Sequence, residues 1–359
     1  MDKYKMDGHK MLWHLDRVLA WQNGERIAPL SIDCGLSKGC NIQCEYCFGQ
    51  MQGNGYKEKA KIVFPREALL EYMRSAGKMG VRSIALIGEG EPTLNPAVYD
   101  AIIEGKKAGV DMSLGTNGVL YDKGDKGIEA LKNLTWIRFN ISAASKEAYQ
   151  KIHNSPMFDT VIDKISFCVE TKNALKLNTT IGLQMVLTPN NADQVVPLAK
   201  LGKELGVDYL VVKQCSDSKD NTLGIYENLG EYKDFTEMLK DAEAVSTDNY
   251  NVIIKWAHIT NEGHRNYKHC IGAPFFLYSS GDGRIYPCGM FFDYKEEEYR
   301  LGDLTKQTFE EIIKSDRYWE VMDKVAHIDT DTCYTNCRTH MINEFAWQIK
   351  NPPEHINFV

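Results

Sequence analysis

The sequence predicts an α/β protein organised around a parallel sheet, in the form of a partial (β/α)6 barrel. From Leu30 onward, short apolar stretches with strand spacing alternate with longer stretches of helical spacing, which is typical of βαβ units. Polar residues follow each apolar stretch directly, as they do where the C-terminal ends of barrel strands form a site. Six such strands are too few for a closed eight-stranded barrel, so we expect an open one.

The elements follow in order along the chain. An extension of residues 1–29 contains a predicted amphipathic helix over 10–22, where Leu12, Leu15, Val18 and Leu19 share one face before a stop at Asn23-Gly24. The barrel is expected over 30–225. Its strands are predicted at 30–35, 82–88, 110–115, 135–141, 177–187 and 207–213, and its helices at 65–79, 96–108, 126–133, 157–173 and 191–205. A connecting unit of 226–262 follows, with a helix at 228–245 and a strand at 250–257.

Composition indicates an ordinary globular protein of 359 residues, with 43% hydrophobic and 25% charged residues. Lys and Arg number 42 against 49 Asp and Glu, a net charge of −7, so we expect no nucleic-acid partner. The first residues lead into no apolar signal core and no run approaches the ~18 apolar residues of a membrane span, so we expect a cytoplasmic protein without a membrane partner. In that compartment ten cysteines indicate metal binding or catalysis rather than disulfides.

Three of these cysteines are closely spaced. Cys40, Cys44 and Cys47 are separated by three residues and then by two, and soft thiolates are the ligands of iron–sulfur clusters. Three ligands leave one iron of a [4Fe–4S] cluster open for chemistry. Zinc is the alternative, but it would need a fourth Cys or His nearby, and after Cys47 the next such residue is His153; Cys34 lies six residues upstream of Cys40.

With Tyr46 before its last cysteine, this Cys-x3-Cys-x2-Cys stretch resembles the signature of the radical S-adenosylmethionine (SAM) superfamily. The resemblance implies that the open iron binds the amino and carboxylate groups of SAM, and that an electron from the cluster cleaves SAM to a 5′-deoxyadenosyl radical. The cofactor carries this chemistry and the protein positions it. An electron donor such as a flavodoxin or ferredoxin is implied as a partner.

The same resemblance implies a set of SAM-binding positions. Gly88-Glu89-Gly90-Glu91-Pro92 follows the second strand and is similar to the glycine–glutamate motif that contacts the SAM amino group; Glu89 stands where many members have glycine, so we give that role to Gly90 and Glu91. Positions after the third and fourth strands are implied to contact ribose or carboxylate, although plain turn roles are equally open. The cofactor-binding positions are therefore Tyr46, Gly90, Glu91, Ser113, Asn117, Asn140 and Ser142.

The sixth strand runs from apolar residues directly into polar ones. By the period of two, Lys213 and Cys215 share a face while Gln214 points the other way. We predict that Lys213 contacts substrate and that Cys215 is the candidate hydrogen donor of an epimerase; a solvated lysine and a buried structural cysteine are the alternatives.

A second cysteine set lies in the C-terminal third. Gly281-Asp282-Gly283 predicts a hairpin that returns Cys288 beside Cys270, and Cys333 and Cys337 complete four thiols, which suit a saturated cluster or structural zinc. The stretch Cys-x12-Gly-x4-Cys resembles the SPASM or shorter twitch region of radical SAM proteins, which implies one auxiliary [4Fe–4S] cluster, two clusters in all. We place this domain at 263–345, with a tail of 346–359.

A saturated cluster near a substrate radical can accept its second electron, which favours dehydrogenation of an alcohol. The main hypothesis is oxidation of a sugar or aminocyclitol, possibly nucleotide-linked, by resemblance to 2-deoxy-scyllo-inosamine dehydrogenase. Epimerisation of such a substrate and modification of a ribosomally made peptide are the alternatives. Against the peptide we count that no separate peptide-recognition domain precedes the barrel.

Overall fold

The computed structural model describes residues 3–49, 62–217, 223–224, 232–261 and 263–358, and a ten-stranded sheet forms the centre of this part of the chain. The strand order is β12-β11-β10-β1-β4-β5-β6-β7-β8-β9. All neighbours from β10 to β9 pair in parallel, and β11 and β12 are antiparallel additions. The strands are β1 (Ser31–Cys34), β4 (Ser83–Leu86), β5 (Asp111–Thr116), β6 (Leu134–Asn140), β7 (Thr180–Leu187), β8 (Tyr209–Gln214), β9 (Asn251–Ile254), β10 (Phe276–Ser279), β11 (Arg284–Tyr286) and β12 (Gly302–Asp303).

The α/β prediction and the six predicted barrel strands, β1 and β4–β8, are confirmed. The sheet is larger than predicted, because β9 pairs with β8 and β10 pairs with β1. Both additions cover backbone groups that would otherwise lie at an open edge. The predicted strand at 250–257 is shorter, since a helix begins at Trp256. A separate two-stranded sheet joins β2 (Ser37–Lys38) to β3 (Ile62–Val63).

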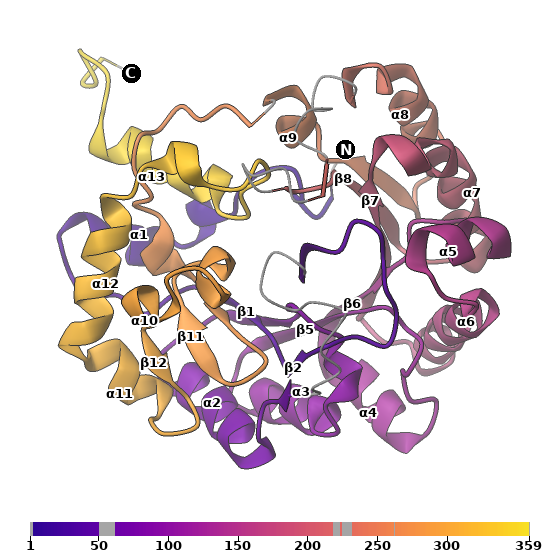
Figure 1. Ribbon diagram of the computed structural model, residues 1–359, viewed down its shortest axis with the longest axis horizontal. Coiled ribbons are helices and arrows are strands. Elements are labelled where there is room, and N and C mark those ends of the chain that lie inside the picture. The colour runs from indigo at the N-terminus through magenta and orange to yellow at the C-terminus, as the bar shows by residue number, and fades with distance from the viewer. Residues whose placement is uncertain (1–2, 50–61, 218–222, 225–231, 262, 359) are drawn as a thin grey trace.

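Helices cover the outer side of the curved sheet, as Figure 1 shows. They are α2 (Arg66–Lys78), α3 (Val98–Lys107), α4 (Asp125–Asn133), α5 (Lys146–His153), α6 (Phe158–Leu175), α7 (Val195–Leu205) and α8 (Thr236–Glu243). The predicted helix at 191–205 starts later, because Pro189–Gln194 form a 3₁₀ helix closed by a capping box of Thr188 and Asn191. Residues 228–231 of the predicted helix at 228–245 and the predicted boundary at 225 lie outside the described residues.

Strand alternation separates an apolar outer face from a polar inner face. On β6, Phe139 packs outward near Tyr121, whereas Arg138 and Asn140 lie on the opposite, inner side. Gly182 stands beside Arg138 in register, and a Cβ there would lie 2.1 Å from the ring of Tyr209, so only glycine fits. Polar side chains of neighbouring strands therefore share one concave surface.

The N-terminal helix packs differently from the prediction. The chain forms a 3₁₀ turn (Met11–Trp13) and then α1 (Leu15–Gln22), and this break at His14 changes the phase of the apolar residues. Leu12, Leu15 and Leu19 are 54%, 52% and 56% exposed. The predicted shared face is therefore wrong as a packing face. A cluster of buried residues makes the contact instead: Met11, Val18, Ile27, Leu30 and Phe275.

The C-terminal third extends the sheet beyond β1, through β10, β11 and β12 (Figure 1). The predicted hairpin is present as β10–β11, and four helices follow it in the chain: α10 (Glu296–Tyr299), α11 (Phe309–Lys314), α12 (Asp316–Ala326) and α13 (His340–Lys350). Before the hairpin, α9 (Trp256–Asn261) packs against β8. Short 3₁₀ helices complete the described elements: Pro92–Leu94, Ala273–Phe275, Gly289–Phe292 and Thr330–Thr332. Within the described ranges, none of the helices combines the length and apolarity that crossing a bilayer requires.

Candidate active site

The three closely spaced cysteines gather in the loop that follows β2. The pKa of the Cys44 thiol is raised well above its usual value, first by burial and then by the neighbouring thiols of Cys47 and Cys40. Burial, followed by the nearby Glu91 carboxylate, raises the pKa of Cys40 to about 12. Protons on such thiols are held until a metal replaces them, so this group suits a positively charged iron centre.

One cysteine of this group contacts a buried histidine. His153 Nδ1 lies 3.0 Å from Cys44 Sγ, and the backbone N–H of Ser142 donates to His153 Nε2 at 3.0 Å. Burial lowers the pKa of His153 to about 3, so the ring is neutral. A neutral ring that accepts at Nε2 carries its proton on Nδ1. His153 therefore donates an N–H to the Cys44 sulfur.

Glu91 is the centre of a hydrogen-bond network that supports the cysteine loop. Its carboxylate, 3% exposed, accepts from Thr93 N (3.1 Å), Thr93 Oγ1 (2.6 Å), Thr116 Oγ1 (2.6 Å) and Asn117 N (2.7 Å). Asn117 Nδ2 in turn donates to Asn41 Oδ1 at 2.7 Å and lies 3.5 Å from Cys40 Sγ. The Glu91 side chain thus joins the ends of β4 and β5 to the first cysteine.

The glycine–glutamate segment also packs against the cysteine loop through its backbone. A Cβ at Gly90 would lie 2.4 Å from the carbonyl oxygens of Ser37 and Gly39, and Ser37 Oγ donates to the Glu91 carbonyl at 2.7 Å. Glu89 turns toward the C-terminal hairpin, where it accepts from Ser280 Oγ (2.6 Å) and Gly281 N (3.2 Å). This contact joins the motif to both cysteine regions.

Of the other predicted cofactor positions, Tyr46, Asn140 and Ser142 lie at the C-terminal ends of the strands, whereas Ser113 lies inside β5, three residues before its end. The hydroxyls of Tyr46 and Ser142 are 2.7 Å apart, and Ser142 Oγ accepts from Val186 N. Asn140 Oδ1 accepts from Gln184 Nε2 at 3.0 Å, and Ser113 Oγ donates to the Ile84 carbonyl at 3.3 Å. The structure brings Tyr46 and Ser142 together and places Asn140 near them, and the contacts of all these residues to SAM remain predictions.

Lys213 and Cys215 occupy the inner face of β8, as their spacing predicts. Val186 of β7 lies beside Lys213 in register. Burial, and then the positive charges of Arg138 and Arg338, lower the pKa of Lys213 to about 8. Cys215 is 1% exposed, and its thiol lies 3.9 Å from the carbonyl of Tyr46, next to Cys47. Burial raises the pKa of this thiol to about 12, so it keeps its proton.

The four C-terminal cysteines gather as a second group. Burial, and then the thiols of Cys337, Cys333 and Cys270, raise the pKa of Cys288 well above its usual value. Asn343 Nδ2 lies 3.6 Å from Cys270 Sγ. Four half-buried thiols in one place, with an amide donor beside them, fit a fully ligated cluster.

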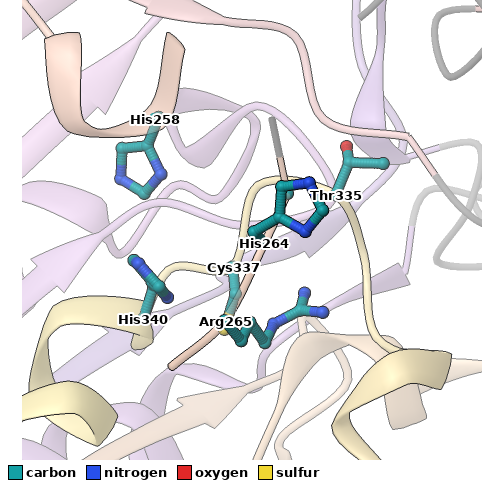
Figure 2. A pocket seen from close by; sticks show the side chains of 7 residues that line it. His258, His264, Arg265, Thr335, Cys337 and His340 are labelled. Atoms are coloured by element: carbon teal, nitrogen blue, oxygen red, sulfur yellow. The ribbon is translucent and has the colours of Figure 1, made fainter. Parts of the chain in front are cut away.

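A small pocket adjoins this second group (Figure 2). Cys337 lies in it between His258 and His340 on one side and His264 on the other. Burial is the main cause that lowers the pKa of both His258, to about 3, and His340. Among the described residues, no three His, Cys, Asp or Glu side chains are placed to hold a single metal ion together.

The two cysteine regions touch each other at the end of β8. Thr335 N donates to the Asp217 carbonyl at 3.0 Å, and Asn336 Nδ2 donates to the Gln214 carbonyl at 2.9 Å. The ring of Phe48 meets that of Tyr334 edge to face, with centroids 4.7 Å apart. Each of these two aromatic residues directly follows a predicted cluster ligand.

Two family models match the chain. The model described as the radical SAM superfamily matches residues 35–239, and the model of an iron–sulfur cluster-binding domain, SPASM, matches residues 275–339. The first covers more than half of the 359 residues. This chain belongs to the radical SAM superfamily. Its cofactors are SAM and [4Fe–4S] clusters, as predicted, and the gathered thiols of both regions fit them.

The chain is similar to several characterised proteins. It is 27% identical over 290 residues to the GTP 3′,8-cyclase of Campylobacter fetus, which covers 76% of this chain and 84% of that protein. It is 24% identical over 319 residues to the cysteine-type anaerobic sulfatase-maturating enzyme of Clostridium perfringens, covering 79% and 80%. The crystal structure of Streptococcus suis SuiB bound to S-adenosylmethionine has a TM-score of 0.64 at 17% identity, with 87% of this chain and 72% of that one covered. This last likeness shows a shared fold.

Several residues of this radical SAM site escaped the sequence analysis. His153 is 109 positions from Cys44, and no local pattern distinguishes a sulfur donor from an ordinary buried histidine. Arg138 lies within a strand of otherwise apolar spacing. A basic residue at such a position of β6 is a sequence signal that could have indicated a site residue. The hydrogen bond between Glu89 and Ser280 joins residues 191 positions apart, so no local pattern predicts it.

Proposed function

We propose that this radical SAM enzyme oxidises an amino-acid side chain of a peptide or protein by two electrons, beginning with removal of a hydrogen atom. The main support is the position of the second cysteine group. It is built on β10, which pairs directly with β1, the strand that leads into the first group. When bound, the first cluster and SAM supply a 5′-deoxyadenosyl radical, and the second cluster supplies an acceptor for one electron.

The chain's own residues would position these groups and exclude water. Cys40, Cys44 and Cys47 would hold the SAM-cleaving cluster, with the network of Glu91 and Asn117 fixing their loop. Cys270, Cys288, Cys333 and Cys337 would hold one auxiliary cluster, which four thiolates saturate. The substrate would then bind on the inner face of the sheet, because polar side chains of β6, β7 and β8 lie on that face.

The relatives favour a peptide over the predicted sugar or aminocyclitol. One relative is by name a sulfatase-maturating enzyme, and SuiB, whose fold is similar, has been solved with its precursor peptide SuiA bound. None of the comparisons described above supports a sugar substrate. The alignment with the sulfatase-maturating relative extends over 80% of that protein's length, which also supports the peptide hypothesis.

Epimerisation is the second candidate, because of Cys215. Its protonated thiol lies on the inner face, against the cluster loop, where it could return a hydrogen atom to a carbon radical. Oxidation removes two hydrogens from the substrate, whereas epimerisation leaves its mass unchanged. The two functions therefore differ in a single measurement.

The test is anaerobic incubation of the reconstituted full chain with SAM and a reductant, beside panels of synthetic peptides, nucleotide sugars and aminocyclitols. Mass spectrometry would follow 5′-deoxyadenosine and each candidate product. A peptide lighter by two hydrogens, formed with 5′-deoxyadenosine, is expected. Turnover confined to the sugars and aminocyclitols would contradict the peptide assignment, and solvent deuterium in a product of unchanged mass would favour epimerisation.

A further inference from the structure

The inner face of the sheet holds an excess of positive charge. Lys213 and Lys255 stand on the same face of adjacent strands, since Lys255 N donates to the Val212 carbonyl in continuation of the β8–β9 ladder. Arg138 and Arg338 are among the strongest electrostatic neighbours of both lysines. The carboxylates in that group of neighbours are Asp33 for Lys213 and Asp7 for Lys255. Four basic groups thus face two acidic ones.

Two of the four cations are already matched. Arg338 Nε lies 3.3 Å from Asp33 Oδ2 in an ion pair. Lys255 Nζ donates to the Met6 carbonyl at 2.6 Å, close to Asp7, whose Oδ2 accepts from Ala257 N. These contacts leave Lys213 and Arg138 as the cations that need an anion.

Lys213 and Arg138 lack such a partner. Lys213 makes no hydrogen bond or ion pair with any residue in the described ranges. Arg138 Nε is buried without a hydrogen-bond acceptor there, and the neighbours of this guanidinium are the neutral Tyr209 hydroxyl and Asp33, which Arg338 already pairs. The Arg138 guanidinium lies 5.0 Å from the centroid of the Trp136 ring, which holds it in place. Lys213 and Arg138 are half-buried, and holding two such cations near each other without matching counter-charges is costly, so the pair favours a compensating anionic ligand.

We propose that Lys213 and Arg138 bind an anionic group of the substrate, a carboxylate or a phosphate, on the inner face of β6 and β8. This inference rests on the proposed function and names a chemical feature of its substrate. Cys215 follows Lys213 on the same face and reaches the Tyr46 carbonyl of the cluster loop at 3.9 Å. An anion held by Lys213 therefore lies next to the radical site and orients the carbon beside it. In a peptide, an Asp or Glu side chain or a C-terminal carboxylate would supply this group.

Trp136 offers a direct readout, because an anion on Arg138 alters the surroundings of the indole. The full chain, reconstituted anaerobically with iron and sulfide, would be titrated with glutarate and with glycerol 3-phosphate, and Trp136 fluorescence recorded. The uncharged glutaramide and glycerol are the matched probes. We expect saturable binding of one or both anions and none of the uncharged probes. Glutarate alone identifies a carboxylate, and glycerol 3-phosphate alone a phosphate. A Trp136→Phe variant should lose the signal.

Variants separate a binding role from a structural one. Lys213→Gln and Arg138→Gln should each lower the affinity for the more tightly bound anion at least about tenfold, because each variant loses a charge-assisted hydrogen bond. Lys213→Arg should keep the affinity, and Lys126→Gln, at an exposed position on α4, is the control. Equal binding of charged and uncharged probes, or unchanged affinity in folded Lys213→Gln and Arg138→Gln, would overturn the proposal. Because this assay involves no SAM cleavage, its failure is distinct from a failure of the proposed function.

Discussion

The rings of Phe48 and Tyr334 meet edge to face, with centroids 4.7 Å apart, and connect the two cysteine loops of the molecule. Phe48 follows Cys47, and Tyr334 follows Cys333. Such a pair contributes about 0.5–1.5 kcal/mol beyond its buried area. The contact fixes the second thiol group close to the SAM-binding edge, which is the arrangement that the proposed oxidation requires.

A double-mutant cycle measures this connection. Phe48→Leu and Tyr334→Leu should each lower the urea midpoint of the reconstituted protein, and the double variant should lose less than the sum, by about 0.5–1.5 kcal/mol. Additive losses would mean that the rings do not stabilise each other. The pair Tyr149 and Phe158, also edge to face at 5.8 Å, serves as a control within the barrel.

His153 should raise the reduction potential of the first cluster, because an N–H donated to a ligand sulfur stabilises the more negative, reduced state. His153→Phe removes this donor and should shift the midpoint to more negative values in an EPR-monitored titration. Tyr149→Phe is the matched control, since the Tyr149 ring stacks on His153 at 4.4 Å and its hydroxyl has no partner among the described residues. A midpoint that moves in neither variant would refute the role of His153.

Glu91→Gln should loosen the first cysteine loop. The carboxylate accepts from four donors, and an amide replaces one acceptor with a donor, which costs about 1–3 kcal/mol in a buried site. We expect a lower thermal midpoint and less iron bound per chain, while exposed Glu237→Gln on α8 changes neither. Normal iron content and stability in the Glu91 variant would show that the network is dispensable.

Anion binding should depend on pH through Lys213. Its pKa is lowered to about 8, so the ammonium loses its charge as the pH rises through that value. Glutarate then loses its cationic partner, and its affinity should fall. The groups that face Lys213 behave differently: Arg138 and Arg338 keep their charge, and the Cys215 thiol keeps its proton. Lys255, with a pKa of about 7, titrates first, and the Asp33 carboxylate is the acidic neighbour of Lys213. Lys213→Arg should abolish the fall in affinity near pH 8, and a fall that persists there would implicate another group.

The fold was predictable to the extent that local pattern determines it. Strands β1 and β4–β8 carry mostly apolar stretches and lie near their predicted bounds, and the β10–β11 hairpin follows from its glycine turn. The pairing of β10 with β1 could not be predicted, because it joins residues about 245 positions apart and parallel pairing leaves no local mark. The exposed face of α1 was misjudged because the break at His14 has no strong sequence signal.

The spacing of the cysteines in the sequence was sufficient to identify the cluster ligands. It was not sufficient to identify the residues that hold the cysteine loop in place. Cys40, Cys44 and Cys47 are close in sequence, so their chemistry could be read directly. The contact of Glu91 with SAM stays a prediction, and the network that its side chain forms could not be predicted, because two of its four donors come from Thr116 and Asn117, about 25 positions away. The charge balance around Lys213 is likewise a tertiary property, because its neighbours come from β6 and from the segment after Cys337.

The central claim is that one chain holds a SAM-cleaving cluster and a saturated auxiliary cluster that serves substrate oxidation. Iron and sulfide analysis of the anaerobically reconstituted protein tests it most directly, beside a variant in which Cys270, Cys288, Cys333 and Cys337 are all replaced by Ala. We predict about eight iron and eight sulfide per chain, falling to about four of each in the variant, which should still form 5′-deoxyadenosine. Stoichiometric zinc at these four cysteines, or an unchanged iron content in the variant, would contradict the account.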